Sequence, residues 1–170
     1  MLKPAIIYKQ RLSDLKALAS MKPHNKYYSL SGFSSFGEES NYDNYHSHSF
    51  VSVDSCDNVL GAMFVGVDRQ IHSIYGLEVI KFEKEYSWVF SKDIIRFFKL
   101  MFGEYKYNQL NFSVCVGSPN EKYQDKFIKK YNGRIVGIKK NHIKLWDGSI
   151  RGEKLYEITR ENICKKLHYS

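Results

Sequence analysis

Three strand-like segments follow one another between residues 50 and 82, with only short turns between them. Phe50 to Asp54 alternates apolar and polar residues, and Val59 to Val67 is almost wholly apolar. Ile71 to Phe82 carries apolar residues on both faces, as strands in the centre of a sheet do. Strands joined by such short turns run antiparallel. This part of the chain therefore predicts a meander whose third strand is central, with Gly76 marking a bulge or a close backbone approach.

Helices and strands alternate after the meander. Ser91 is a good N-cap for a helix that ends at Gly103, and Leu110 to Val116 is the next strand. The helix carries an apolar stripe at i, i+3, i+4 and i+7, widened on one side: Ile94, Ile95, Phe97, Phe98, Met101 and Phe102. A strand, a helix and a second strand in this order form a crossover unit, which predicts that part of the sheet is parallel.

A second helix is expected after the strand that ends at Val116. Ser118 fits the N-cap, Pro119 the first helical position, and Glu121 the capping box. Its aromatic face has i, i+4, i+8 spacing and consists of Tyr123, Phe127 and Tyr131. A strand from Ile135 toward Trp146, a turn at Asp147-Gly148 and a returning strand from Lys154 to Ile158 complete the chain.

The N-terminal part of the chain, before residue 50, has shorter apolar patterns. Ala5 to Lys9 is a short β-branched run that predicts a strand, and Ser13 fits the N-cap of a helix that Pro23 ends. A short helical turn is expected from Asn25 to Leu30. The stretch Ser31 to Ser49 is rich in Ser, Asn, Gly and Tyr without a period, so it predicts a long functional loop. With 170 residues, the chain fits one α/β domain spanning 1–170.

Composition excludes some classes of protein and leaves others open. The net charge of +8 favours anionic partners, such as nucleotide cofactors, nucleic acid or acidic protein surfaces. The three cysteines are widely spaced, which indicates a reducing compartment without disulfides, and no apolar run is long enough to span a membrane. We therefore expect a cytoplasmic protein.

Three smaller groups of residues have the chemistry of possible functional sites. His46 and His48 lie on one side of an extended chain, but only Asp43 is near them, so we expect no metal. Cys115 lies inside a strand, where a buried thiol is inert. Tyr105-Lys106-Tyr107 could stack on nucleic-acid bases, although a solvated helix end explains the same residues.

The C-terminal third of the chain carries a specific set of residues: Val116, Phe127, Lys130, Tyr131, Arg134-Ile135-Val136-Gly137, Asp147-Gly148 and Leu155-Tyr156-Glu157-Ile158. With these residues it resembles GNAT N-acetyltransferases of bacteria and their phages. The N-terminal half is similar only in the order of its elements. The resemblance implies a mixed sheet of six or seven strands with about four helices, splayed between its fourth and fifth strands, here Ile71–Phe82 and Leu110–Val116.

The same resemblance implies a site for acetyl-CoA in the split. Its pantetheine would add to the sheet as a strand along Leu77, Val79 and Ile80. Asn120 would form a hydrogen bond with it, with a role in capping the helix alone as the alternative. Lys84, Lys92 and the helix start at Ser91 would hold the pyrophosphate. The family's glycine-rich loop is missing here: residues 83–93 contain no glycine, and they contain Glu83, Glu85 and Asp93, which would repel phosphate.

Catalysis is the second point on which the sequence departs from the family. Many GNAT enzymes use a tyrosine on the helix after strand five to protonate the leaving thiolate, and Ile128 occupies that position here. Tyr123 is the best substitute, although an amphipathic stripe with Phe127 would explain it as a core residue. Glu78 is the candidate general base, with a solvent-facing charge as the alternative.

The sequence therefore predicts transfer of an acetyl group from acetyl-CoA to a primary amine. The loop Ser31–Ser49, with Glu38, Glu39 and Asp43, would read the cationic acceptor. The alternative is a GNAT-fold protein without catalysis that binds a protein or nucleic acid through its basic surface, such as a phage accessory or virion protein.

Overall fold

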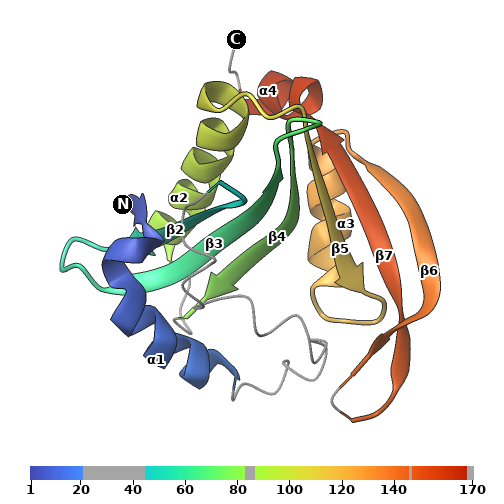
Figure 1. Cartoon of the computed structure of the whole chain (residues 1–170), viewed down its shortest axis with the longest axis horizontal. Helices are drawn as coiled ribbons and strands as arrows, with labels where there is room; N and C mark the ends of the chain where they lie inside the picture. The colour runs from blue at the N-terminus through green and yellow to red at the C-terminus, as the bar shows by residue number, and fades with distance from the viewer. Residues whose placement is uncertain (21–44, 83–86, 146, 168–170) are drawn as a thin grey trace.

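The structure is a computed structural model that describes residues 1–20, 45–82, 87–145 and 147–167 (Figure 1). The strands are β1 (Leu2–Pro4), β2 (Ser47–Val53), β3 (Val59–Asp68), β4 (Ser73–Lys81), β5 (Gln109–Cys115), β6 (Arg134–Lys144) and β7 (Ile150–Thr159). The helices are α1 (Lys9–Ser20), α2 (Trp88–Lys99), α3 (Glu121–Lys130) and α4 (Arg160–Leu167), with a 3₁₀ turn η1 (Ala5–Tyr8) and a π turn η4 (Leu100–Glu104). No helix in these residues is long and apolar enough to cross a membrane.

The strands of the described residues form one seven-stranded sheet in the order β1-β2-β3-β4-β5-β7-β6. Neighbouring strands are antiparallel except β4 and β5, which are parallel. A parallel pair needs a crossover, and α2 with η4 provides it. The predicted fold class, an α/β fold with a mixed sheet and four helices, is therefore confirmed, as is the meander of β2, β3 and β4.

The pairing of β4 with β5 is confined to one end of the two strands. It covers only Ile74↔Leu110 and Tyr75↔Asn111, after which the strands diverge toward their carboxyl ends (Figure 1). Tyr75 and Glu78 of β4 pair with Gly66 and Phe64 of β3. Between these two pairs, β4 has two residues and β3 has one. Gly76 lies in this bulge with φ of 61°, a conformation that suits glycine. The predicted bulge is confirmed, and the split of the sheet begins beside it.

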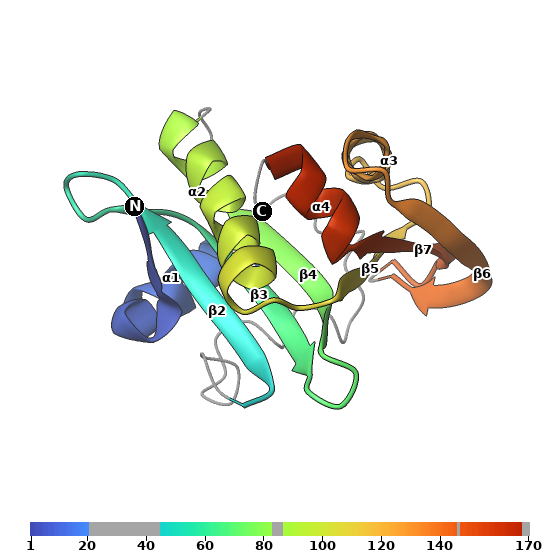
Figure 2. The ribbon, with the colours of Figure 1, turned by 90° about the horizontal axis from the view of Figure 1, so that it is seen from above.

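Helices cover both faces of the sheet. Figure 2 shows α2, α4 and α3 on one face and α1 on the other. The larger core lies under the three helices and is rich in aromatic residues, with Phe97, Tyr107 and Tyr156 almost wholly buried. A smaller core on the α1 face joins η1 and α1 to β2 and β3. Apart from Tyr8, the buried aromatic residues of the described chain lie in the larger core.

The prediction for the extreme N-terminus is wrong. The strand comes before Ala5, and Ala5–Tyr8 forms the 3₁₀ turn that leads into α1. Both ends of this turn are buried, whereas Ile6 and Ile7 are exposed, a spacing of three residues instead of the alternation of a strand. Pro4 cannot donate to a sheet and ends β1. Ser13 consequently lies inside α1 and does not cap it.

The predicted start of α2 is also wrong. The N-cap is Ser87, whose Oγ accepts a hydrogen bond of 3.2 Å from the backbone N–H of Phe90. Ser91 lies in the first turn, and its Oγ donates to the carbonyl of Ser87. Phe90 is buried, so the helix has to include it, whereas Ile95 is 40% exposed and does not extend the stripe as predicted.

The start of α3 differs from the predicted capping box. The helix begins at Glu121, and Asn120 in the N-cap position makes no side-chain cap bond. The Oγ of Ser118 is buried and accepts no such bond either, because no hydrogen-bond partner lies near it among the described residues. The carboxylate of Glu121 instead reaches back one residue further and accepts from the N–H of Gly117 at 2.8 Å.

Three other predictions concern the chain between these elements. Ser47–Ser49, which we expected in the long loop, form the beginning of β2, and residues 21–44 lie outside the described residues. The turn at Asp147-Gly148 is confirmed, since Gly148 has φ of 80° and its N–H donates to the carbonyl of Leu145. The final helix, α4, has no counterpart in the sequence prediction.

Candidate functional site

The split between β4 and β5 ends beside the starts of two helices. A Cβ on Gly61, which pairs with Lys81 at the end of β4, would lie 2.4 Å from the ring of Phe90 in α2. This close packing fixes the start of α2 beside the end of β4. The α3 helix begins a few residues after Cys115, at the end of β5. The N–H groups of both helix starts, with their partial positive charge, therefore lie at the open end of the split.

The β4 residues after the bulge form one wall of the split. Leu77 packs against the core under α2, whereas Ile80 packs against the core under α1, so alternate residues face opposite sides of the sheet. Glu78 is half-buried and shares the α1 face with Ile80, and Val79 is 38% exposed on the α2 face. The structure thus gathers the β4 candidates along the edge that β5 leaves.

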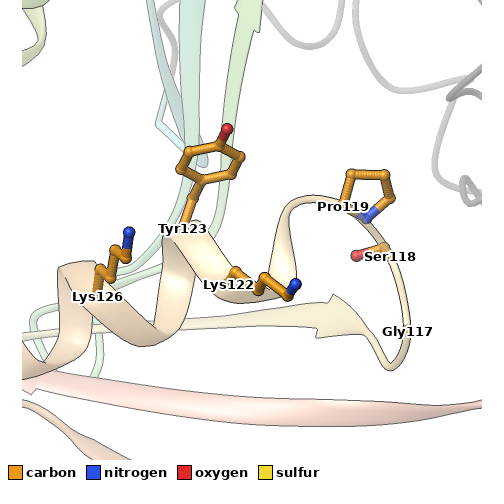
Figure 3. A pocket seen from close by; sticks show the side chains of 6 residues that line it. All are labelled: Gly117, Ser118, Pro119, Lys122, Tyr123 and Lys126. Atoms are coloured by element: carbon orange, nitrogen blue, oxygen red, sulfur yellow. The ribbon is translucent and has the colours of Figure 1, made fainter.

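A pocket of about 440 Å³ lies at the other wall, where β5 leads into α3 (Figure 3). It is lined by Gly117, Ser118, Pro119, Lys122, Tyr123 and Lys126. Tyr123 is 70% exposed, so its interpretation as a core residue is wrong. The ring of Phe127 packs on Tyr131, with 4.9 Å between centroids, and Tyr123 points away from that pair toward solvent. Its phenol is therefore accessible to a ligand.

Acidic side chains of α3 face β7 and are neutralised there. Lys154 Nζ lies 2.8 Å from Asp125 Oδ1 and 3.2 Å from Glu121 Oε1, and Tyr156 Oη donates to Asp125 at 2.8 Å. The hydrogen bond from Lys154, followed by that from Tyr156, lowers the pKa of Asp125. Burial, together with Asp125, raises the pKa of Tyr156. This network fixes α3 against the sheet and holds Asp125 on the β7 side, while the second oxygen of Glu121 accepts from the N–H of Gly117 at the edge of the pocket.

Basic side chains of α3 line the pocket itself. Lys122 and Lys126 are exposed, and neither makes an ion pair with another described residue. They are one helical turn apart, so they share a side of the helix. Sequence reasoning did not select them, because lysines at this spacing are common on solvated helices. Glu121 and Asp125 are also one turn apart, and both pair with Lys154 of β7. Only the tertiary structure shows that Lys122 and Lys126 have no described acidic partner of this kind.

The start of α2 exposes Trp88 and Lys92, whereas its acidic residue Asp93 is buried. Trp88 is 63% exposed, and Lys92 Nζ lies 5.2 Å from the centre of its ring. Asp93, which we expected to repel phosphate, is wholly buried on the other side of the helix. Its Oδ1 pairs with Arg96 at 2.8 Å, and its Oδ2 accepts from Ser52 at 2.7 Å and lies 2.9 Å from the amino group of Met1.

These contacts decide the charge of Asp93. Burial alone would raise the pKa of this carboxyl, but the hydrogen bonds from the Met1 amino group, Ser52 and Arg96 outweigh burial and lower it. The carboxylate is thus ionised, paired and directed into the protein. It does not face the split, and the sequence-based objection to anion binding at the start of α2 no longer applies to it.

The remaining predicted residues have mixed outcomes. Lys84 lies outside the described residues. Ser91 is one turn into α2, with its hydroxyl bound to Ser87, so it does not form the helix start that was expected to hold a phosphate. Asn120 is exposed at the start of α3. Ile128, at the family's tyrosine position, is buried in the core under the helices and offers no polar atom to the split.

Two smaller predictions can also be compared with the structure. Tyr107 cannot stack on a base, because it is wholly buried and hydrogen-bonded to His48 at 2.7 Å. Cys115 is buried, and burial raises the pKa of its thiol, as expected of an inert cysteine. No cluster of three or more possible metal ligands occurs among the described residues.

Comparisons with known proteins relate this geometry to a fold. No protein-family model and no curated sequence matches the chain. Solved structures do match. The spermidine N-acetyltransferase of Vibrio cholerae, determined with CoA and spermine, superposes with a TM-score of 0.72 at 14% identity, over 96% of this chain and 96% of that chain. The chain has the GNAT fold.

A second structure of the Vibrio cholerae enzyme, determined with manganese ions, superposes with a TM-score of 0.66 at 11% identity, over 98% of this chain and 95% of that chain. The splayed sheet that the resemblance implied is thereby confirmed, with β4 and β5 as its fourth and fifth strands. At these identities the match establishes the GNAT fold and leaves the chemistry to the residues of this chain.

Proposed function

We propose that this protein is an N-acetyltransferase that moves the acetyl group of acetyl-CoA to a primary amine. The observation that carries the proposal is the split beside Gly76: past Tyr75, no strand of the described residues pairs with β4 on the β5 side. An exposed strand edge binds peptide-like groups through their N–H and C=O groups. The pantetheine arm of CoA has such amides and would run along Leu77, Val79 and Ile80, with Asn120 donating from α3.

The reaction needs a base for the amine and an acid for the thiolate. Glu78 lies on the α1 face of β4, and Tyr123 extends from α3, which covers the opposite face. A thioester in the split would lie between these two faces. The amine nitrogen attacks the carbonyl carbon while Glu78, directly or through water, takes its proton; the C–S bond then breaks, and Tyr123 gives its proton to the sulfur. The products are the N-acetyl amine and free CoA.

The pyrophosphate is assigned to the start of α2. Lys92 is exposed there, Lys84 precedes the helix, and Asp93 is turned inward. The acceptor is proposed to be a cationic amine read by Glu38, Glu39 and Asp43, which lie outside the described residues. Polyamines are the first acceptors to examine, because the Vibrio cholerae enzyme of the same fold was determined with spermine.

An acetyl-transfer assay with spermidine and a panel of primary amines tests the proposal, with release of free CoA as the readout. Tyr123→Phe should lower kcat by about 100-fold or more, since a positioned acid contributes about 10²–10⁴. Tyr131→Phe, on the core side of α3, is the control. Glu78→Gln should lose activity at neutral pH and recover part of it at high pH, where the amine loses its proton without help. No acetylation of any amine by the wild type would contradict the proposal.

A second candidate function is binding of a macromolecular partner without catalysis. It is favoured by β6, an edge strand on which Ile135, Val136 and Ile138 are each half exposed or more. Its charged side chains are all basic: Arg134, Lys139, Lys140 and Lys144. An anionic protein or nucleic acid would suit this edge. Thermal stability that does not respond to millimolar acetyl-CoA would favour this candidate over the enzyme.

A further inference from the structure

We propose that Ser118 and Lys122, at the start of α3, form a second phosphate site that holds a phosphate group of the acyl donor. The inference rests on the proposed function, since it takes the donor to be a CoA thioester. The site is separate from the start of α2, to which the pyrophosphate is assigned above. It lies where β5 ends, on the other side of the split.

The hydroxyl of Ser118 is the first observation that indicates a ligand. Ser118 is 7% exposed, and its Oγ has no hydrogen-bond partner among the described residues. Buried hydroxyls are nearly always bonded, because an unmade bond is costly. Figure 3 shows this hydroxyl on the inner side of the loop, facing the first turn of α3, with the side chain of Lys122 extending toward it. A phosphate oxygen between them would accept from both groups.

The charge around the pocket is the second observation. Lys154 holds Asp125 and one oxygen of Glu121 on the β7 side, and the other Glu121 oxygen accepts from the Gly117 N–H. Lys122 and Lys126, on the pocket side of α3, therefore have no described acidic partner. Two lysines one turn apart repel each other in the free protein. The start of a helix adds partial positive charge from its N–H groups. An anion in the pocket would relieve the repulsion and use all three sources of positive potential.

The direction of the side chains separates this site from the reaction. Lys122 and Tyr123 are consecutive, so they leave the helix roughly 100° apart. Figure 3 shows Lys122 directed toward the loop at Gly117 and Ser118, with Tyr123 directed away from it. The phosphate end and the thioester end of one extended cofactor would therefore meet α3 from different sides. The missing glycines in residues 83–93 give a reason for a second anchor of this kind.

The test measures binding of CoA and of dephospho-CoA, which lacks the 3′-phosphate, by isothermal titration calorimetry. Lys122→Gln should weaken CoA binding about tenfold, the lower end for loss of a hydrogen bond to a charged group. Lys129→Gln, on the same helix but outside the pocket, is the control and should leave the affinity unchanged. Because the pyrophosphate is assigned to the start of α2, the 3′-phosphate is the expected group, and Lys122→Gln should remove the preference for CoA over dephospho-CoA. An equal loss of affinity for both ligands would contradict a second site separate from that of the pyrophosphate.

Ser118→Ala separates a ligand site from a packing defect. In the free protein it should raise Tm or leave it unchanged, because it removes an unpaired buried hydroxyl, and it should nevertheless weaken CoA binding. Wild-type affinity for both ligands in Lys122→Gln and Ser118→Ala would overturn the site while leaving the proposed function standing.

Failure of the wild type to bind either CoA or dephospho-CoA would instead overturn the proposed function. Inorganic pyrophosphate then becomes the probe. Changes in the amide NMR signals of Gly117 to Lys126 would support the phosphate site, and their absence would exclude it.

Discussion

Removing Lys154 should loosen α3 from the sheet. Its ammonium bridges Asp125 and Glu121 at 2.8 and 3.2 Å, and its side chain is only 12% exposed. A hydrogen bond to a charged group contributes about 1.5–3 kcal/mol when buried, whereas an exposed ion pair contributes about 1 kcal/mol or less. Asp125 is 41% exposed, so we expect about 1.5 kcal/mol for Lys154→Met, between these limits. For a domain of this size that corresponds to a fall in Tm of about 3–6 °C.

The pH dependence identifies the cause of this change. The bond from Lys154 holds the pKa of Asp125 below its ordinary value of 3.8. The stability from this pair is therefore present above that value and lost as the pH falls through the lower pKa of the folded state. The difference in Tm between wild type and Lys154→Met should be full at pH 7 and shrink below pH 3.8.

Differential scanning calorimetry from pH 7 to pH 3 measures this dependence. Lys165→Met is the matched control, since Lys165 pairs with Glu161 on the exposed surface of α4 and should show no measurable change. A deficit in Lys154→Met that is absent at pH 7, or constant down to pH 3, would refute the role given to this network.

Two further predictions concern packing and accessibility. Gly61→Ala should lower the free energy of unfolding by about 1–3 kcal/mol in chemical denaturation, because a Cβ there meets the Phe90 ring at 2.4 Å and the Ile80 carbonyl at 2.6 Å. The control is Gly137→Ala, where a Cβ meets nothing within 4 Å. Equal effects of the two substitutions would contradict the packing of α2 on β3. A thiol reagent followed by mass spectrometry should label exposed Cys56 rapidly and buried Cys115 slowly, since burial raises the pKa of the Cys115 thiol. Labelling of Cys115 at the rate of Cys56 would contradict the burial of this residue in β5.

The sheet and its central helix could be predicted from the sequence because their patterns are long. β3 and α2 are 10 and 12 residues long, and their apolar patterns cover most of that length. The turn at Asp147-Gly148 has a specific chemistry. The run Ala5 to Lys9 is too short to separate a strand from a 3₁₀ turn by periodicity. Ser87 and Ser91 are equally good caps, and contact of Phe90 with Gly61 decides between them. That contact joins residues far apart in sequence.

One part of the candidate site could be predicted from the sequence and the other could not. The wall formed by β4 could be found from the sequence, because Gly76 lies in a central strand and the resemblance assigns the cofactor there. The pocket at α3 could not, since its character depends on which charges of the helix are neutralised. Only the register of β7 brings Lys154 to Asp125 and leaves Lys122 without a described acidic partner. Likewise, Asp93 is acidic in the sequence but is turned inward and paired in the folded protein.

Hydrogen exchange of the β4 amides with and without acetyl-CoA tests the central claim most directly. If the pantetheine adds to β4 as a strand, the amides between Leu77 and Lys81 become protected, whereas β2 amides, already paired with β1 and β3, change little. Protection confined to residues 77–81 and the adjoining starts of α2 and α3 is the result we predict. Unchanged exchange in β4 at saturating acetyl-CoA, or protection elsewhere alone, would contradict the assignment of the split as the cofactor site.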